Sequence, residues 1–299
     1  MKTSFVTTVL NEAKTINDLL DSLQTQTKLP DEVVIVDAGS TDATLDLIKA
    51  HPLNQSVTIR IISQQGVNRS QGRNLGIKSA NHQIIALSDA GCVLDNGWLA
   101  RITGPLTSAS IDSVAGYYQT TADSVLAKAM APFVAIMPDR FNPKTYLPSS
   151  RSLALKKSAW LKVGQYPENL DFCEDLIFSA KLKAQTRMVV KPEAIVFWQI
   201  EDSLKGFYHR LKNYASGDVL AGYWPHLIKI ISVYLRYLVF FTVPPLFLAY
   251  LFWPIIKFNH DVFGFKAIIC LPLVQLTADL AVLRGALLGL KFRLQRIVK

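Results

Sequence analysis

Short apolar runs alternate with amphipathic segments along the first ninety residues of the chain. The apolar runs are rich in Val, Ile and Leu, and they predict strands at residues 5–10, 32–37, 57–62 and 83–88. Between the runs, apolar residues recur at helical spacing in residues 13–23, 43–50 and 69–80. Strands that alternate with helices in this way favour a parallel, doubly wound α/β sheet.

Acidic residues follow three of the predicted strands. Glu12 and Asp37 end the first and second strands, and Asp89 ends the fourth in Ser88-Asp89-Ala90-Gly91. Because ligands of open α/β sheets bind beyond the carboxyl ends of the strands, these acids indicate a site. Ribose hydroxyls and a base imide N–H are donors that carboxylates accept, and a divalent cation on Asp89 would carry phosphates. An aspartate that only caps the next turn is the alternative for Asp89.

The second half of the chain predicts further elements. They are a helix at 95–106, a strand at 113–119, a helix at 124–136 and a loop at 138–152. The loop contains Arg151, which is either a phosphate contact or a plain surface arginine. Glu174 and Asp175 begin another predicted helix, where acids are also common for the helix dipole alone. The chain has neither the GxGxxG turn nor the GxxxxGK[ST] loop that binds phosphates in other nucleotide-binding proteins.

The remainder of the chain is apolar and basic. Residues 203–220 predict an amphipathic basic helix, which lies at a membrane surface or packs on the domain. Residues 237–256 carry no charge over twenty positions and can span a bilayer with a kink at Pro244-Pro245. Residues 263–290 predict a weaker second span, in which Asp279 pairs with Arg284 or contacts a lipid head group. A re-entrant or interfacial hairpin is the alternative.

Charge is unevenly distributed along the 299 residues. Residues 227–299 hold nine Lys and Arg against two acids, a net charge of +7, which leaves +2 of the total of +9 to residues 1–226. A basic, apolar tail indicates anionic membrane lipids as partners and no nucleic acid. The three cysteines have no metal or disulfide spacing, which favours reduced thiols. No signal peptide is predicted, so residues 1–226 are expected on the cytoplasmic side.

Five motifs, in order, resemble those of the family 2 glycosyltransferases, which have the GT-A fold. The motifs are Leu10-Asn11-Glu12, the residues 36–42 with sequence VDAGSTD, Arg73-Asn74, Ser88-Asp89-Ala90-Gly91 and Glu174-Asp175. The resemblance covers about residues 1–220. It implies a Rossmann-like mixed sheet flanked by helices, to which this chain adds a C-terminal membrane-associated helical hairpin. It also implies an inverting transfer of a sugar from a nucleotide-diphosphate donor.

The resemblance assigns residues to the donor. Glu12 and Asp37 correspond to contacts with the nucleoside, and Arg73 corresponds to a further nucleotide contact. Asp89 corresponds to the acid that bridges a divalent metal, Mg²⁺ or Mn²⁺, to the diphosphate. The family usually has a second acid two residues after the first, where this chain has Gly91.

The resemblance also assigns the acceptor side. Asp175 corresponds to the catalytic base, which takes the proton of the acceptor hydroxyl, and Glu174 to its acceptor-positioning neighbour. Arg210 is a candidate contact with the diphosphate. His209 is a candidate ligand for the metal position that Gly91 leaves open.

We therefore expect a catalytic domain at 1–226, followed by membrane-associated helices at 227–299. Within the catalytic domain, residues 1–92 form the nucleotide-sugar half and 93–226 the acceptor half. The expected acceptor is a lipid-linked glycan, a polyprenyl phosphate or a polysaccharide at the cytoplasmic face of the inner membrane, in cell-envelope glycan biosynthesis. A nucleotidyltransferase and a catalytically inactive membrane scaffold are the alternative functions.

Overall fold

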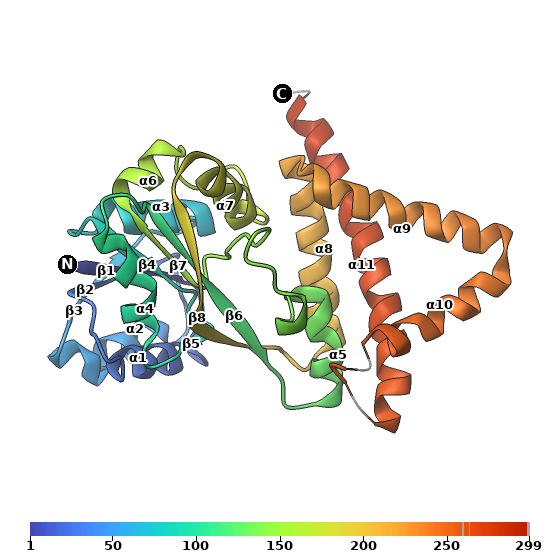
Figure 1. The fold of residues 1–299 in the computed structure, drawn as a ribbon, viewed down its shortest axis with the longest axis horizontal. Helices are drawn as coiled ribbons and strands as arrows, with labels where there is room; N and C mark the ends of the chain where they lie inside the picture. The colour runs from blue at the N-terminus through green and yellow to red at the C-terminus, as the bar shows by residue number, and fades with distance from the viewer. Residues whose placement is uncertain (259, 263, 298–299) are drawn as a thin grey trace. The chain divides into compact units, whose positions relative to one another are not determined.

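A computed structural model describes residues 1–258, 260–262 and 264–297 (Figure 1). The chain divides into two compact units. The first unit comprises Met1–Gln119 and Phe141–Trp198, and the second comprises Thr120–Arg140 and the residues from Gln199 onward. The fold thus divides the chain before residue 226, and the functional boundary expected there stays a prediction.

The first unit contains one mixed sheet. Its strands are β1 (Thr3–Val9), β2 (Glu32–Asp37), β3 (Thr58–Ser63), β4 (Ile84–Leu87), β5 (Cys92–Leu94), β6 (Ser113–Thr121), β7 (Leu153–Lys156) and β8 (Met188–Gln199). They are arranged in the order β3-β2-β1-β4-β7-β6-β8-β5. Strands β1 to β4 are parallel, as the sequence predicts, whereas β7 is antiparallel to both β4 and β6. Strand β5 is antiparallel to β8. The expected mixed sheet is therefore present.

Helices cover both faces of this sheet (Figure 1). One face carries α1 (Ile16–Gln24), α2 (Thr44–Ala50) and α4 (Trp98–Thr103), and the other carries α3 (Arg69–Ser79), α6 (Lys157–Lys162) and α7 (Glu174–Gln185). Short 3₁₀ turns lie at Pro52–Gln55, Gly104–Thr107 and Pro138–Arg140. The helix expected at 95–106 is shorter than predicted, because Pro105 lacks the N–H that would continue α4 and a 3₁₀ turn follows instead.

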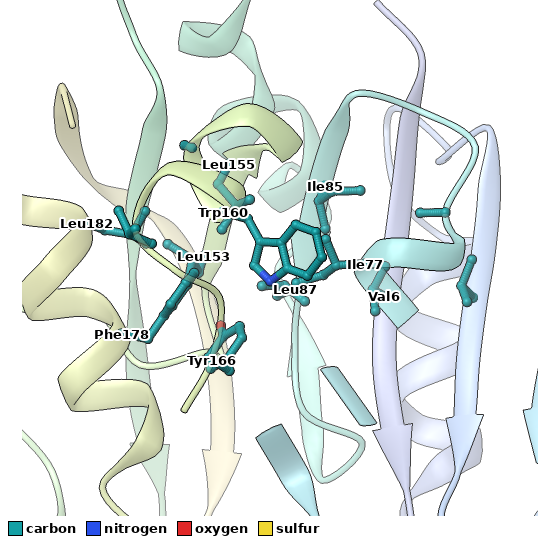
Figure 2. Packing of buried hydrophobic residues seen from close by; sticks show 14 residues of the cluster. Val6, Ile77, Ile85, Leu87, Leu153, Leu155, Trp160, Tyr166, Phe178 and Leu182 are labelled. Carbon is teal, nitrogen blue, oxygen red and sulfur yellow. The ribbon is translucent and has the colours of Figure 1, made fainter. Parts of the chain in front are cut away.

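The hydrophobic core on the α3 face surrounds the ring of Trp160, as Figure 2 shows. Residues from β1, α3, β4, β7 and α7 meet there, and among the largest are Ile77, Leu153, Tyr166, Phe178 and Leu182. Each fully buried side chain of this kind contributes about 1.5–3 kcal/mol relative to exposure. The indole nitrogen of Trp160 donates to Asn74 Oδ1 at 3.0 Å, so the one polar atom of that ring is satisfied.

The second unit is helical. It consists of α5 (Val125–Val134), α8 (Leu204–Ala221), α9 (Trp224–Thr242), α10 (Pro244–Lys257) and α11 (Phe265–Ile297). Helix α8 confirms the helix predicted at 203–220. The closest packing is that of α11 on α8, where a β-carbon on Gly285 would lie 2.2 Å from the carbonyl oxygen of Lys212. Glycine allows two helix backbones to approach to this distance.

The first predicted span, 237–256, is wrong as one continuous helix. Helix α9 ends at Thr242 and α10 begins at Pro244, so the chain turns instead of kinking. Two consecutive prolines remove two backbone donors, and proline is well accommodated only in the first turn of the helix that follows. By length and composition, the helices able to cross a membrane among the described residues are α9 and α11. The predicted start of the second span, Phe263, lies outside the described residues.

A buried aspartate joins the apolar helices. Asp279 of α11 accepts hydrogen bonds from Tyr237 and Arg236 of α9 at 3.1 and 3.3 Å. It also accepts from Tyr250 of α10 at 2.6 Å. The ion-pair partner of Asp279 is therefore Arg236 and not Arg284, because Arg236 approaches from a neighbouring helix. A charged residue in an apolar environment is tolerated when it is paired and hydrogen-bonded in this way.

Replacing Gly76 tests how closely α3 must approach the sheet. A β-carbon there would lie 2.5 Å from Cγ1 of the buried Val6. The clash exceeds the gain in helix propensity, so Gly76→Ala should lower the free energy of unfolding by about 1–2 kcal/mol. Urea unfolding of the full chain in detergent measures the change. Gly91→Ala is the control, because an added β-carbon at Gly91 has no atom within 4 Å and Gly91 is not among the glycines with positive φ. Equal stability of both variants would contradict the close approach.

Candidate active site

The predicted acids lie at one edge of the sheet in the first unit. Strands β2, β1 and β4 are neighbours and run parallel, so their carboxyl ends share that edge. Glu12 follows β1, Asp37 is the last residue of β2, and Asp89 follows β4. The two arginines that the sequence singles out in this unit, Arg73 and Arg151, also reach Asp89. The structure therefore brings these predicted site residues together.

The loops after β1 and β2 bind each other. The side-chain oxygen of Asn11 accepts from the backbone N–H of Thr41 at 2.8 Å, and the Asn11 N–H donates to Ser40 Oγ at 2.9 Å. Asn11 has a φ of +57°, a left-handed conformation that asparagine tolerates better than most residues. The carboxylate of Asp37 accepts from the N–H groups of Gly39 and Ser40. These contacts fix the two loops that hold the proposed nucleoside contacts.

Glu12 is held at the same edge. Its N–H donates to Thr44 Oγ1 at 2.8 Å, and its carboxylate accepts from Thr15 Oγ1 at 2.8 Å. Partial burial raises the pKa of Glu12, and the negative charge of Asp89 raises it further. The two acids therefore share one region of negative potential, which a cation or a hydrogen-bond donor would relieve.

Arg73 connects the end of β4 with the start of α7. Its Nη2 lies 2.9 Å from Asp89 Oδ1, and its Nη1 lies 2.7 Å from Glu174 Oε1. The Arg73 side chain is only 5% exposed, so the guanidinium depends on these two carboxylates. The family resemblance predicts a nucleotide contact for Arg73. The contacts that the structure shows are with the two acids, and the nucleotide contact stays a prediction.

The carboxylates around Arg73 have shifted pKa values. Burial alone would raise the pKa of Asp89, but the charges of Arg73 and Arg151 outweigh it and hold that pKa below its ordinary value. Burial raises the pKa of Glu174, and the adjacent charge of Asp175 raises it further despite the contact with Arg73. Acids whose neighbours push their pKa values in opposite directions are typical of active sites.

Arg151 lies on the opposite side of Asp89. Its Nε is 3.8 Å from Asp89 Oδ2. The guanidinium stacks over the ring of Trp198 at 4.2 Å and over that of Tyr118 at 5.2 Å. The side chain is 16% exposed, so the alternative of a plain surface arginine is wrong. Stacking on aromatic faces stabilises a guanidinium in a fixed orientation.

Asp175 is connected to Arg151 through a serine that the sequence analysis missed. Ser149 Oγ donates to Asp175 Oδ2 at 2.9 Å and accepts from Arg151 Nη1 at 3.1 Å. The residue before α7, Cys173, has a φ of +68°. This is a strained conformation for a residue with a side chain, and such strain is common at functional sites. The only sequence signal for Ser149 was its place in a polar segment just before an apolar run.

Arg210 and His209 lie in the second unit, on α8. Arg210 Nη2 is 3.2 Å from Glu201 Oε2, within that unit. The ring of His209 lies 3.5 Å from Lys212 Nζ. The expected contact of Arg210 with a diphosphate and that of His209 with a metal stay predictions.

The residues around Asp89 fit a metal that arrives with a substrate. Among the described residues, no group of three or more His, Cys, Asp and Glu side chains could hold a metal ion. Oδ1 of Asp89 is bound by Arg73, while Oδ2 faces Arg151 at ion-pair distance only. A β-carbon on Gly91, two residues after Asp89, would meet no atom within 4 Å. Mg²⁺ is often held by one carboxylate together with phosphate oxygens and water.

Comparison with known proteins identifies relatives of the chain. It is 23% identical over 258 residues to a poly-β-1,6-N-acetyl-D-glucosamine synthase of Staphylococcus epidermidis, an alignment that covers 78% of this chain and 59% of the synthase. The chain thus spans little more than half the length of the first curated relatives that it matches.

Solved structures share the fold. Mannosyltransferase PcManGT from Pyrobaculum calidifontis, in complex with GDP-Man and Mn²⁺, aligns with a TM-score of 0.57 at 16% identity over 97% of this chain and 74% of its own. TarS 1–349 of S. aureus, in complex with UDP-GlcNAc, aligns with a TM-score of 0.55 at 20% identity over 72% and 66% of the two chains. These likenesses show a GT-A fold, as the sequence predicts.

The family model described as glycosyl transferase family 2 matches residues 4–159, a little over half of the chain. That match includes Glu12, Asp37, Arg73 and Asp89, the four predicted donor residues of the sheet edge. The chain therefore belongs to glycosyltransferase family 2.

Proposed function

We propose that this chain is an inverting glycosyltransferase that moves a sugar from a nucleotide-diphosphate donor to an acceptor. One observation carries the proposal: Arg73 joins Asp89, at the donor edge of the sheet, to Glu174 at the start of α7. The acids proposed for donor and acceptor therefore belong to one connected cluster. Membership of family 2 supports the same reaction.

The donor would bind across the carboxyl ends of β1, β2 and β4. Glu12 and Asp37 accept hydrogen bonds from hydroxyls and N–H groups of the nucleoside, because ionised carboxylates only accept. Arg73 supplies positive charge next to Asp89, which would attract the phosphates of the donor. Arg210 is a further candidate contact with the diphosphate, from the second unit.

A divalent cation is the proposed cofactor. Asp89 would hold it, together with oxygens of the donor phosphates and water. Mg²⁺ or Mn²⁺, when bound there, stabilises the negative charge of the departing nucleoside diphosphate. The Mn²⁺ named for PcManGT supports a metal of this kind.

Asp175 is the proposed base. Its carboxylate takes the proton of the acceptor hydroxyl while that oxygen bonds to the anomeric carbon of the sugar. The bond from that carbon to the diphosphate oxygen breaks, and its electron pair leaves with the nucleoside diphosphate. A single displacement of this kind inverts the anomeric configuration. Glu174 positions the acceptor side through its contact with Arg73.

The second unit and the relatives support a proposal for the acceptor and the location. A lipid-linked glycan, a polyprenyl phosphate or a polysaccharide is the proposed acceptor class, and the polysaccharide synthase among the relatives supports it. Helices α9 and α11 are long and apolar enough to cross a membrane. We therefore place the enzyme at the inner membrane, with its active site on the cytoplasmic side and in contact with membrane lipids.

Replacing the proposed base tests the reaction. Asp175→Asn keeps the shape of the side chain but cannot take a proton, so turnover should fall by about 10²–10⁴-fold while donor affinity stays near that of the wild type. Release of UDP from UDP-GlcNAc, or of GDP from GDP-mannose, measures turnover, and calorimetry measures binding. Asp171→Asn, at an exposed acid just before α7, is the matched control. Normal turnover of Asp175→Asn would exclude this base, and release of pyrophosphate would indicate a nucleotidyltransferase.

The metal proposal has its own test at Asp89. Titration of UDP with and without Mn²⁺ should show tighter binding with the metal for the wild type, but no such gain for Asp89→Asn. The reason is that the amide is a far weaker ligand than the carboxylate. Asp46→Asn, at an exposed acid of α2, should keep the metal effect. An undiminished metal effect in Asp89→Asn would rule out this ligand, and failure of the wild type to bind any nucleotide would favour an inactive scaffold.

Membrane association is tested by fractionation. The full chain, expressed in bacteria, should stay in the membrane pellet after alkaline carbonate washing, because exposed apolar side chains of α9 and α11 would face lipid. Complete release by carbonate would show that the helices neither span nor insert.

A further inference from the structure

One face of α7 holds the segment at residues 144–149, which we term the serine segment. The side chains responsible are Asp175, Ser179 and Lys183, four residues apart and therefore stacked on one side of the helix. Ser179 Oγ donates to the carbonyl oxygen of Pro148 at 2.6 Å. Lys183 Nζ donates to the carbonyl oxygens of Lys144 and Tyr146 at 2.6 and 3.1 Å. Two of the three side chains, Ser179 and Lys183, thus fix the backbone of the segment through three hydrogen bonds.

The third side chain, Asp175, makes a different kind of contact, because here the segment fixes a carboxylate of the helix. Ser149 Oγ lies 2.9 Å from Asp175 Oδ2, and nothing in this pair holds the backbone of the segment. Ser149 is half-buried and so is Asp175, which leaves the pair in reach of a substrate. On this helix face, Ser179 and Lys183 therefore have a structural role, whereas the contact of Asp175 acts on the proposed base.

The direction of the Ser149 hydrogen bond follows from its other partners. The backbone N–H of Arg151 lies 3.4 Å from Ser149 Oγ, and Arg151 Nη1 lies 3.1 Å from it. A backbone N–H and a guanidinium can only donate, so they occupy the lone pairs of the hydroxyl. The single proton of that hydroxyl is then directed to Asp175 Oδ2.

We propose that Ser149 is a positioning residue for the base, an inference that rests on the proposed function. By donating to Oδ2 it fixes the rotation of the Asp175 carboxylate and leaves Oδ1 to take the proton from the acceptor hydroxyl. The acceptor oxygen then bonds to the anomeric carbon, and the carbon–oxygen bond to the diphosphate breaks with its electron pair. Arg151 holds Ser149 in this orientation while its Nε lies 3.8 Å from Asp89. The orientation of the base is thereby linked to the donor side.

The neighbouring serine offers a matched comparison. Ser150 Oγ shares a hydrogen bond with the Tyr166 hydroxyl at 2.8 Å in the buried core, whereas Ser149 Oγ donates to Asp175. Removing the Ser150 hydroxyl should lower stability, because it leaves the Tyr166 hydroxyl buried without a partner. It should leave the turnover number unchanged. Removing the Ser149 hydroxyl should lower the turnover number and leave the stability unchanged.

The experiment compares two substitutions of equal shape. Ser149→Thr keeps the hydroxyl and Ser149→Val lacks it, so any packing effect is common to both. With UDP-GlcNAc or GDP-mannose, whichever the wild type turns over faster, and Mn²⁺ present, Ser149→Val should reduce kcat by about 10-fold and leave the donor KM unchanged. Ser149→Thr should keep kcat within about twofold of the wild type. Ser149→Ala and Ser150→Ala complete the set, and thermal unfolding of each variant reports its folding.

The outcomes separate the two proposals. Wild-type kcat in both Ser149→Val and Ser149→Ala, with Asp175→Asn inactive, would overturn the positioning role and leave the base in place. A rise in donor KM alone would also overturn it, because Ser149 would then contact the donor. Equal losses in Ser149→Thr and Ser149→Val, with Ser149→Ala like the wild type, would indicate packing instead. Full turnover of Asp175→Asn, or no turnover of either donor by the wild type, would remove the proposed function and the positioning role with it.

Discussion

The ion pairs of Arg73 are the interaction on which the rest of the site depends. A buried guanidinium without a carboxylate partner is strongly unfavourable, and removing one partner of such a pair typically costs about 3–5 kcal/mol. Arg73 has two partners, Asp89 and Glu174, and Glu174 lies 101 residues away in the chain. The fold must therefore bring α7 to the end of β4. In doing so it brings the start of α7, with Asp175, to the sheet edge that carries Asp89.

The position of Arg73 is itself set by how closely α3 approaches the sheet. Gly72 and Gly76 face β1, where a β-carbon would lie 2.8 Å from Thr8 and 2.5 Å from Val6. Next to Arg73, Asn74 donates to the carbonyl oxygen of Tyr166 at 2.9 Å and accepts from Trp160. Arg73 and Asn74, which are adjacent in the chain, thus have different roles. Arg73 orders the charged site, and Asn74 fixes the chain that leads from the core into α7.

Two arginines lie beside Asp89, the single acid that the sequence offers at the position of the family's metal motif. Arg73 and Arg151 flank that carboxylate from two sides, and Arg151 is held by the rings of Trp198 and Tyr118. Two guanidinium groups beside Asp89 would repel a free cation, so the proposed metal would have to arrive together with the negatively charged donor phosphates. At position 91, where the family usually has the second acid, an added β-carbon would meet no atom within 4 Å.

The sequence by itself determined the parallel strands, the helices between them and the acids at the strand ends. These features depend on periodicity and turn chemistry within a few residues, so a single sequence displays them. It also located the proline pair that ends α9, although not that the chain would turn there into a separate helix. Strands β5, β7 and β8 escaped detection. The first two comprise only three and four residues, and β8 contains Pro192, a residue that argues against a strand.

Only the tertiary structure decided which charged groups meet. The pairing of Arg73 with Glu174, of Arg151 with Asp89 and of Ser149 with Asp175 joins positions that lie 26 to 101 residues apart. The partner of Asp279 was likewise settled by packing, since Arg236 reaches it from another helix. Such contacts arise when buried faces pack together, and the identity of a side chain does not reveal what lies opposite it. Asp89 was visible as a strand-end acid, but its two arginines became visible only in the fold.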